Sequence, residues 1–246
     1  MDFKEGEILY FDKPLTWTSF ALVNKVRYQL CRKLGVKKLK VGHAGTLDPL
    51  ATGVMILCTG KATKRIEELQ AHTKEYVAIL QLGATTPSFD LEKEIDATYP
   101  TAHITRPLVE EVLARFVGRI EQVPPAFSAC MVDGKRAYDL ARKGEEVNLK
   151  PKTLVIDEIE LMECDLTRMI ITIRVVCSKG TYIRALARDI GQALQSGAHL
   201  IALVRTRVGE VTQDKCRSIE QFTEWLEQVV PHHAPEGIPS QSLWQE

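Results

Sequence analysis

Short apolar segments separated by polar turns predict a series of β-strands along the chain. Residues 75–82 are apolar on both alternating faces, which is typical of a central strand in a sheet. Strands of this kind would form the core of the protein. The other segments predicted as strands are residues 8–11, 54–58, 153–162, 169–177 and 200–208.

Apolar residues recur at helical spacing in four segments that alternate with these strands. Residues with side chains that accept hydrogen bonds precede the first three segments, and glycines follow them, as helix boundaries require. Several connections between strands are too short for helical crossovers, so we expect an α+β fold with a mixed, mainly antiparallel sheet. The predicted helices run from a cap at Ser19 to Gly35, from a cap at Thr105 to near Gly118, from Thr181 to near Gly197, and over 218–229.

Length and composition favour one large domain over residues 1–230. The chain has 246 residues, 45% of them hydrophobic, which is enough to build a core of that size. Residues 124–151 are irregular and basic, and we interpret them as an insertion in the domain. Residues 231–246 contain three prolines and no periodicity, which predicts a disordered tail.

Charge and cysteine content narrow the classes of function. Lysine plus arginine and aspartate plus glutamate both number 32, so any nucleic-acid contact must come from local basic patches. The six cysteines form no CxxC pair and no cluster at zinc-ligand spacing, which predicts free thiols in a reducing cytosol and no metal site. The chain has neither a signal peptide nor an apolar stretch of about 20 residues, so we expect a cytoplasmic protein without a membrane partner.

The most informative segment is 42–53, with the sequence Gly-His-Ala-Gly-Thr-Leu-Asp-Pro-Leu-Ala-Thr-Gly. Its three glycines relax backbone restrictions and allow another chain to approach closely. Pro49 biases Asp48 toward an extended conformation, which holds the carboxylate on a defined loop. An isolated Asp-Pro is more often a plain turn, so this dipeptide alone does not indicate a catalytic carboxylate.

This twelve-residue string resembles the catalytic motif of the TruB-type tRNA pseudouridine synthases. Further segments resemble the same family in the same order, although Thr16 stands where a glycine is usual and Val204 where an arginine is frequent. The resemblance covers about residues 6 to 229. The matching segments are 13–19 (Lys-Pro-Leu-Thr-Trp-Thr-Ser), 74–76 (Lys-Glu-Tyr), 177–184 (Cys-Ser-Lys-Gly-Thr-Tyr-Ile-Arg) and 197–207.

The resemblance implies the pseudouridine synthase fold, with residues 124–151 as an RNA-gripping thumb, and it implies a role for each matched residue. Asp48 would be the catalytic carboxylate, Tyr76 would stack on the target base, and Arg184 would pair with Asp48. His43 would help to occupy the space that the flipped base leaves. The other expected substrate contacts are Lys13, Gly45, Lys179, Tyr182 and Arg205, with Lys61, Lys64 and Arg136 as further candidates for phosphate contacts.

Arg184 supports this interpretation on physical grounds. If a helix begins at Thr181, Arg184 falls in its first turn, where the helix dipole disfavours a cation. Arg188, four residues on, adds like-charge repulsion. A carboxylate partner would relieve both costs, and the pair would hold Asp48 ionised and oriented.

The resemblance also implies a substrate and a mode of action. We expect isomerisation of uridine-55 in the T-arm loop of tRNA, by a monomer that uses base flipping and needs no cofactor. Too few residues follow 230 to form the RNA-binding PUA domain of many relatives, so no guide RNA is expected. The alternatives are a non-catalytic protein that binds or folds tRNA, and pseudouridylation of another RNA.

Overall fold

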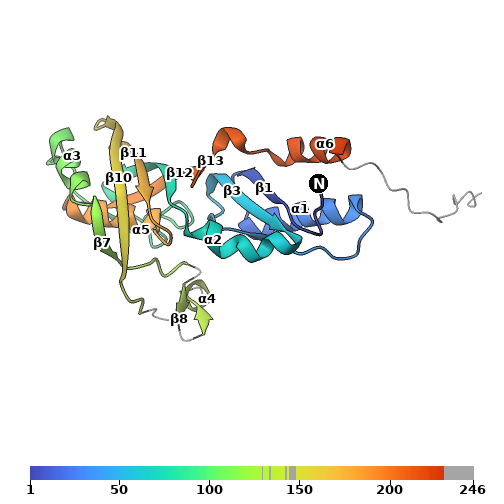
Figure 1. Ribbon diagram of the computed structural model, residues 1–246. Helices are drawn as coiled ribbons and strands as arrows, with labels where there is room; N and C mark the ends of the chain where they lie inside the picture. The colour runs from blue at the N-terminus through green and yellow to red at the C-terminus, as the bar shows by residue number, and fades with distance from the viewer. Residues whose placement is uncertain (129, 133, 142, 144–147, 230–246) are drawn as a thin grey trace, which may run out of the picture.

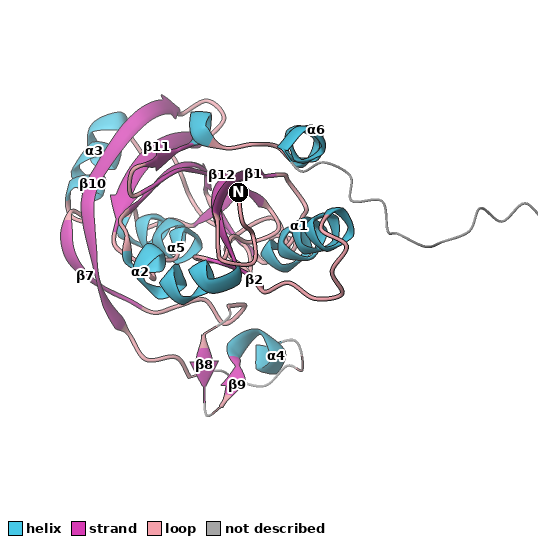
Figure 2. Cartoon of the chain, turned by 45° about the vertical axis from the view of Figure 1, so that its right-hand side comes forward, coloured by secondary structure: helices cyan, strands magenta, loops and turns pink. Residues whose placement is uncertain are grey.

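The computed structural model of the chain describes residues 1–229, apart from 129, 133, 142 and 144–147 (Figure 1). The predicted tail, 231–246, lies outside the described residues. A long sheet forms the middle of the molecule and helices cover its faces (Figures 1 and 2). This arrangement confirms the predicted α+β class.

The central sheet has nine strands within the described part of the chain. The pairing of β3 with β12 is parallel and the other pairings are antiparallel, which confirms a mixed, mainly antiparallel sheet. The strand order is β1 (Ile8–Lys13), β3 (Ala51–Thr59), β12 (Ala198–Val208), β4 (Lys74–Leu82), β11 (Ile170–Cys177), β10 (Lys152–Asp165) and β7 (Gly118–Gln122), while β2 (Val41–His43) pairs with β3 and β13 (Val211–Thr212) with β12.

Two small hairpins lie outside this sheet, one of them within the basic stretch 124–151. That stretch also holds the short helix α4 and lies apart from the sheet in both views (Figures 1 and 2). The hairpins are β5 (Ala84–Thr85) with β6 (Ala97–Thr98), and β8 (Met131–Val132) with β9 (Lys135–Arg136). The helices are α1 (Ser19–Lys33), η1 (Gly60–Arg65), α2 (Ile66–Ala71), α3 (Arg106–Ala114), α4 (Ala137–Ala141), α5 (Ile183–Ala193), η2 (Gln213–Lys215) and α6 (Ile219–Val229).

Two of the three predicted helix caps differ in the structure. Thr18, not Ser19, caps α1, because its hydroxyl accepts a hydrogen bond from the Ala21 amide at 3.0 Å. Thr105 caps α3 as predicted. Tyr182 precedes α5 without a side-chain cap, while the Thr181 hydroxyl donates to the Ser178 carbonyl in the preceding turn. Arg184 still lies in the first turn of α5.

Apolar residues form separate cores on the two halves of the sheet. One core packs α3 and α5 against β4, β11 and β12. A second core packs α1 and α6 against β1 and β3. Strand β4 is central as predicted, but its residues alternate between buried and half-buried, so one of its faces carries the tighter packing.

The segment 44–50 joins β2 to β3 and lies where β3 runs parallel to β12; we call it the Asp48 loop. Gly53 pairs with Arg205 in this parallel ladder and has φ +103°. A Cβ at Gly53 would lie 2.2 Å from the Arg205 carbonyl oxygen. Glycine is therefore required here both by backbone conformation and by the approach of β12.

Candidate active site

The Asp48 loop is fixed to the N-terminal part of the chain through backbone groups. The Ser19 hydroxyl accepts from the Leu47 amide at 2.8 Å and donates to the Leu47 carbonyl at 2.9 Å. The Lys13 ammonium is fully buried and donates to the carbonyls of Trp17 at 2.7 Å and Pro49 at 3.4 Å. Burial lowers the pKa of Lys13 to about 8. Both neighbours of Asp48 are therefore tied to buried side chains.

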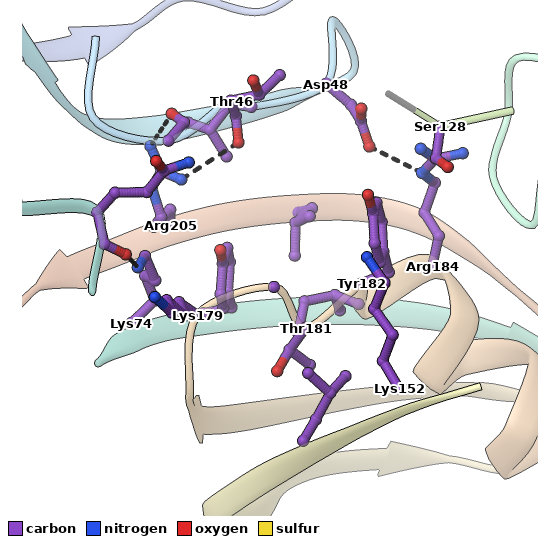
Figure 3. Close-up of a pocket in the computed structure, with 18 of the residues that line it drawn as sticks. Thr46, Asp48, Lys74, Ser128, Lys152, Lys179, Thr181, Tyr182, Arg184 and Arg205 are labelled. Atoms are coloured by element: carbon purple, nitrogen blue, oxygen red, sulfur yellow. Dashed lines mark hydrogen bonds and ion pairs between the residues drawn. The ribbon is translucent and has the colours of Figure 1, made fainter. Parts of the chain in front are cut away.

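Arg184 binds Asp48, as predicted. Its Nε donates to Asp48 Oδ2 at 2.8 Å (Figure 3). Its two terminal nitrogens donate to the carbonyls of Ser88 at 3.1 Å and Phe127 at 3.0 Å. The Arg184 side chain is 5% exposed, whereas the Asp48 side chain is 39% exposed. A buried guanidinium, each of whose nitrogens donates a hydrogen bond, thus holds a carboxylate that is accessible to solvent.

Asp90 is a residue of this site that the sequence analysis missed. Its side chain is 7% exposed, and its Oδ2 lies 3.6 Å from Arg184 Nε. It also accepts a hydrogen bond from the Glu92 amide at 2.9 Å. Arg184 therefore lies between two carboxylates, one buried and one accessible. Position 90 falls in a polar loop without periodicity, so its sequence context gave no signal.

Arg205 was predicted to contact phosphate, but its guanidinium is turned into the protein. The residue is 1% exposed. It donates to the carbonyls of Val54 at 2.8 Å, Gly45 at 3.2 Å and Thr46 at 3.4 Å. Figure 3 shows the Arg205 guanidinium turned toward Thr46. Arg205 therefore holds the backbone of the Asp48 loop and the start of β3.

Asp48 lies at the edge of a cavity of about 580 Å³. The volume is within the range of pockets that hold small organic groups. The cavity brings together residues from segments 42–53, 74–76, 177–184 and 197–207, but none from 13–19. Its lining includes Gly45, Asp48, Lys74, Tyr76, Ser128, Lys152, Lys179, Tyr182, Arg184, Leu203 and Arg205.

Aromatic and basic side chains surround this cavity in different ways. Tyr76 is 8% exposed on β4, and burial raises the pKa of its hydroxyl. Tyr182 is half-buried, and burial raises its pKa as well. Lys179 is exposed at the rim, while Lys74 is buried with its pKa lowered to about 8 by desolvation. Lys152 reaches the Sγ of Cys130 at 3.2 Å. The cavity therefore combines apolar ring faces with positive charge.

Other predicted contacts lie away from the cavity. His43 ends β2 just before the Asp48 loop and does not line the cavity; burial, together with the Arg205 charge, lowers its pKa. Lys61 and Lys64 are exposed on η1, and Lys61 pairs with Glu5 at 2.6 Å. The side chain of Arg136 lies outside the described part of the structure. The cavity thus contains Asp48, Tyr76, Arg184, Gly45, Lys179, Tyr182 and Arg205, but not His43, Lys13, Lys61 or Lys64.

Thr16, where the motif resemblance departs from glycine, has φ 70°. This left-handed conformation is unfavourable for a β-branched residue, and it accounts for a preference for glycine at the position. The Thr16 amide donates to the Pro49 carbonyl at 2.8 Å. The turn therefore keeps its contact with the Asp48 loop despite the substitution.

No group of three or more His, Cys, Asp or Glu side chains among the described residues could hold a metal ion. None of the helices in this part of the chain combines the length and hydropathy that crossing a bilayer requires.

Comparison with known proteins agrees with the site. The family model described as TruB family pseudouridylate synthase (N terminal domain) matches residues 32–183, and that of the tRNA pseudouridylate synthase B C-terminal domain matches 184–233. The tRNA pseudouridine synthase B of Phocaeicola vulgatus is 79% identical over 93% of this chain and 96% of its own length. That of Flavobacterium johnsoniae is 50% identical over 92% of this chain and 98% of its own length.

A solved structure shows the same fold at lower identity. A chain in the crystal structure of a Cbf5-Nop10-Gar1 complex superposes with a TM-score of 0.69 and 27% identity. The match covers 92% of this chain but 55% of the other. The fold and the site define a pseudouridylate synthase, which is an isomerase. Within that class, the chain belongs to the TruB family of pseudouridylate synthases.

Proposed function

We propose that this chain is a tRNA pseudouridine synthase that converts uridine-55 in the T-arm loop to pseudouridine, as a monomer and without a guide RNA. The observation that carries the proposal is the Asp48–Arg184 contact of 2.8 Å at the edge of a cavity large enough for a nucleotide base. The names of the relatives, tRNA pseudouridine synthase B, support tRNA as the substrate.

The reaction moves the glycosidic bond within one nucleotide. The bond between C1′ and N1 breaks, the uracil turns, and C1′ bonds to C5. N1 gains a proton and C5 loses one, so the composition does not change. Asp48 acts beside the ribose and the base, by attack on the sugar, by attack on the ring, or by removal of a sugar proton. Each route requires an accessible carboxylate of fixed orientation. The Asp48 side chain is accessible, and its contact with Arg184 fixes its orientation.

The target uridine must leave its stack to reach Asp48, which costs a few kcal/mol. Tyr76 and Tyr182 line the cavity and offer ring faces, and stacking on an aromatic ring contributes roughly 1–3 kcal/mol per base. Lys179 and Lys152 place positive charge at the same cavity for the flanking phosphates. The segment 124–151 supplies Ser128 to the lining and would close on the RNA from that side.

The direct test uses an unmodified tRNA transcript and carbodiimide-primer extension. We expect wild-type protein to produce one stop, at the T-loop uridine, and Asp48→Asn to bind the transcript without converting it. Asp214→Asn, on η2, makes the same chemical change at an exposed site and should retain full conversion. Equal conversion by Asp48→Asn would remove the proposed mechanism.

Two further outcomes separate the alternatives. Tight binding by the wild type without conversion would favour a non-catalytic tRNA-binding protein. Mapping pseudouridine across the total RNA of a deletion strain tests the target. We expect loss of signal in the T loop of tRNA, and loss confined to ribosomal or messenger RNA would contradict the assignment.

A further inference from the structure

A second basic surface lies on helix α1, away from the cavity that contains Asp48. The exposed side of α1 and the connection that follows it form an open groove. We call this surface the α1 groove. It is lined by Asn24, Arg27, Tyr28, Cys31, Lys37, Lys38, Leu39 and Lys40.

The α1 groove concentrates positive charge in a chain whose formal net charge is zero. Four of its eight lining residues are cationic and none carries a carboxylate. Lys37, Lys38 and Lys40 are exposed, and none of them forms an ion pair with a carboxylate of the described residues. Such a local excess of charge is typical of a surface that binds phosphate groups.

The acidic groups near α1 lie on its other side. Helix α6, which carries several glutamates, packs against α1, where Lys33 pairs with Glu227 and Gln29 bonds to Thr223. Glu227 is therefore paired with Lys33, and no residue of α6 lines the α1 groove. Within the groove, the Arg27 guanidinium donates to Asn24 Oδ1, a contact that orients it without removing its charge.

The α1 groove also carries an exposed aromatic ring. Tyr28 is 62% exposed, and Phe20 is 65% exposed two turns earlier on the same helix. Large exposed rings next to cations are a common arrangement for contacts with nucleotides, because the ring stacks while the cations bind phosphate.

Both ends of the α1 groove connect to the Asp48 loop. Ser19, the first residue of α1, bonds to Leu47, and Arg27 lies about 12 Å further along the helix at 1.5 Å per residue. Lys40 directly precedes β2, whose three residues lead into the same loop. In Figure 2 the connection after α1 leaves the helix on the side away from α6, which lies above it.

We propose that the α1 groove binds the sugar-phosphate backbone of the substrate RNA at nucleotides away from the flipped uridine. The inference rests on the proposed function, since it assigns the groove to the same RNA. Each phosphate that a cation neutralises adds about 0.7–0.9 to the slope of log Kd against log salt. Lys37, Lys38 and Lys40 together should therefore account for about two to three units of that slope.

The test compares two triple variants that lose the same three positive charges. In the first, Lys37→Gln, Lys38→Gln and Lys40→Gln are combined. In the control, Arg106→Gln, Arg115→Gln and Arg168→Gln remove exposed charges on α3 and at the β10–β11 turn, at the opposite end of the molecule from α1 (Figure 1). Thermal melting of both variants establishes that each is folded.

We expect the lysine variant to bind a full-length tRNA transcript at least tenfold more weakly than wild type at moderate salt, with the slope reduced by about two to three. The loss should appear in KM and not in kcat. The control should match wild type. A photoreactive p-benzoylphenylalanine in place of Tyr28 should crosslink to the same transcript.

Equal affinity and equal salt slope in the two triple variants would overturn the inference and leave an acidic protein as the occupant of the α1 groove. Failure of the proposed function is a different result, because wild-type protein would then produce no pseudouridine in the transcript.

Discussion

Two buried arginines flank the Asp48 loop and act on different parts of it. Arg184, from the first turn of α5, reaches the side chain of Asp48. Arg205, from β12, reaches the backbone carbonyls of Gly45, Thr46 and Val54 and makes no ion pair with a carboxylate of the described residues. Both residues are buried.

The two arginines therefore have different roles: Arg184 orients the reacting carboxylate, and Arg205 supports the backbone of the loop. Arg184 places one carboxylate oxygen, so its loss should affect the chemical step most. Arg205 donates to three backbone carbonyls of the loop and of β3, so its loss should affect folding most. Measurements of activity and of stability on matched variants therefore distinguish the two roles.

The largest effect is expected for Arg184→Lys. Lysine keeps the charge but cannot bond to Asp48, Ser88 and Phe127 at once, because it lacks the planar fork of arginine. We expect kcat to fall about 100-fold or more, the loss that a misplacement of about 1 Å produces. Single-turnover conversion of a tRNA transcript measures it.

Arg188→Lys, one turn later on α5, is the matched control. Arg188 bonds to Asp189 and to the Val123 carbonyl and does not line the cavity, so its kcat should stay within twofold of wild type. Equal losses in the two variants would mean that α5, and not the Asp48 contact, accounts for the effect.

Arg205→Met should lower the free energy of unfolding by about 2 kcal/mol, because buried carbonyls lose their donors. Urea denaturation followed by circular dichroism measures this change. Arg207→Met, on the same strand but 31% exposed, should lose less than half as much. If Arg205→Met lost much of its kcat but none of its stability, Arg205 would act in the chemical step and not in folding.

Asp90→Asn should lower kcat about tenfold with little change in KM. The amide keeps the shape of the side chain and can still accept from the Glu92 amide, but it removes a charge 3.6 Å from Arg184 Nε. Steady-state kinetics on a tRNA transcript checks this. If stability falls and kcat does not, Asp90 supports the fold and not the arginine.

The smallest effect is expected for Ser19→Ala, which removes both bonds to Leu47 while Thr18 still caps α1. We expect a loss of about 1 kcal/mol in the free energy of unfolding and a decrease in kcat of less than fivefold. Thr18→Ala removes the cap instead and should destabilise the protein without changing kcat. Urea denaturation and kinetics on both variants test this difference.

The sequence predicted the sheet from local signals, whereas the Asp48–Arg184 contact came from the motif resemblance together with one such signal. Alternating and continuous apolar segments identified the long strands, and an arginine at a helix N-terminus indicated a carboxylate partner. The cap of α1 was predicted at Ser19 and lies at Thr18, because serine and threonine both favour capping positions. Contacts across the chain decided between them, because Ser19 bonds to Leu47.

Buried cations could not be predicted in the same way. Lysine and arginine are almost never fully buried unless they are paired, so Lys13 and Arg205 were expected at the surface, in contact with phosphate. Their partners are backbone carbonyls of the Asp48 loop and its neighbours, and every residue type has a carbonyl. Asp90 was missed for a related reason, because its partner Arg184 is remote in sequence.

The parallel ladder between β3 and β12 limits how this region can change length. Gly53 lies opposite Arg205, and no larger residue fits there. Inserting one amino acid between Asp48 and Gly53 would shift β3 by one position, which reverses the face that each side chain occupies. It would also place Thr52 opposite Arg205, where its Cβ would clash with the Arg205 backbone. Natural and engineered variants should therefore tolerate substitutions at residues 50–52 far better than insertions or deletions there.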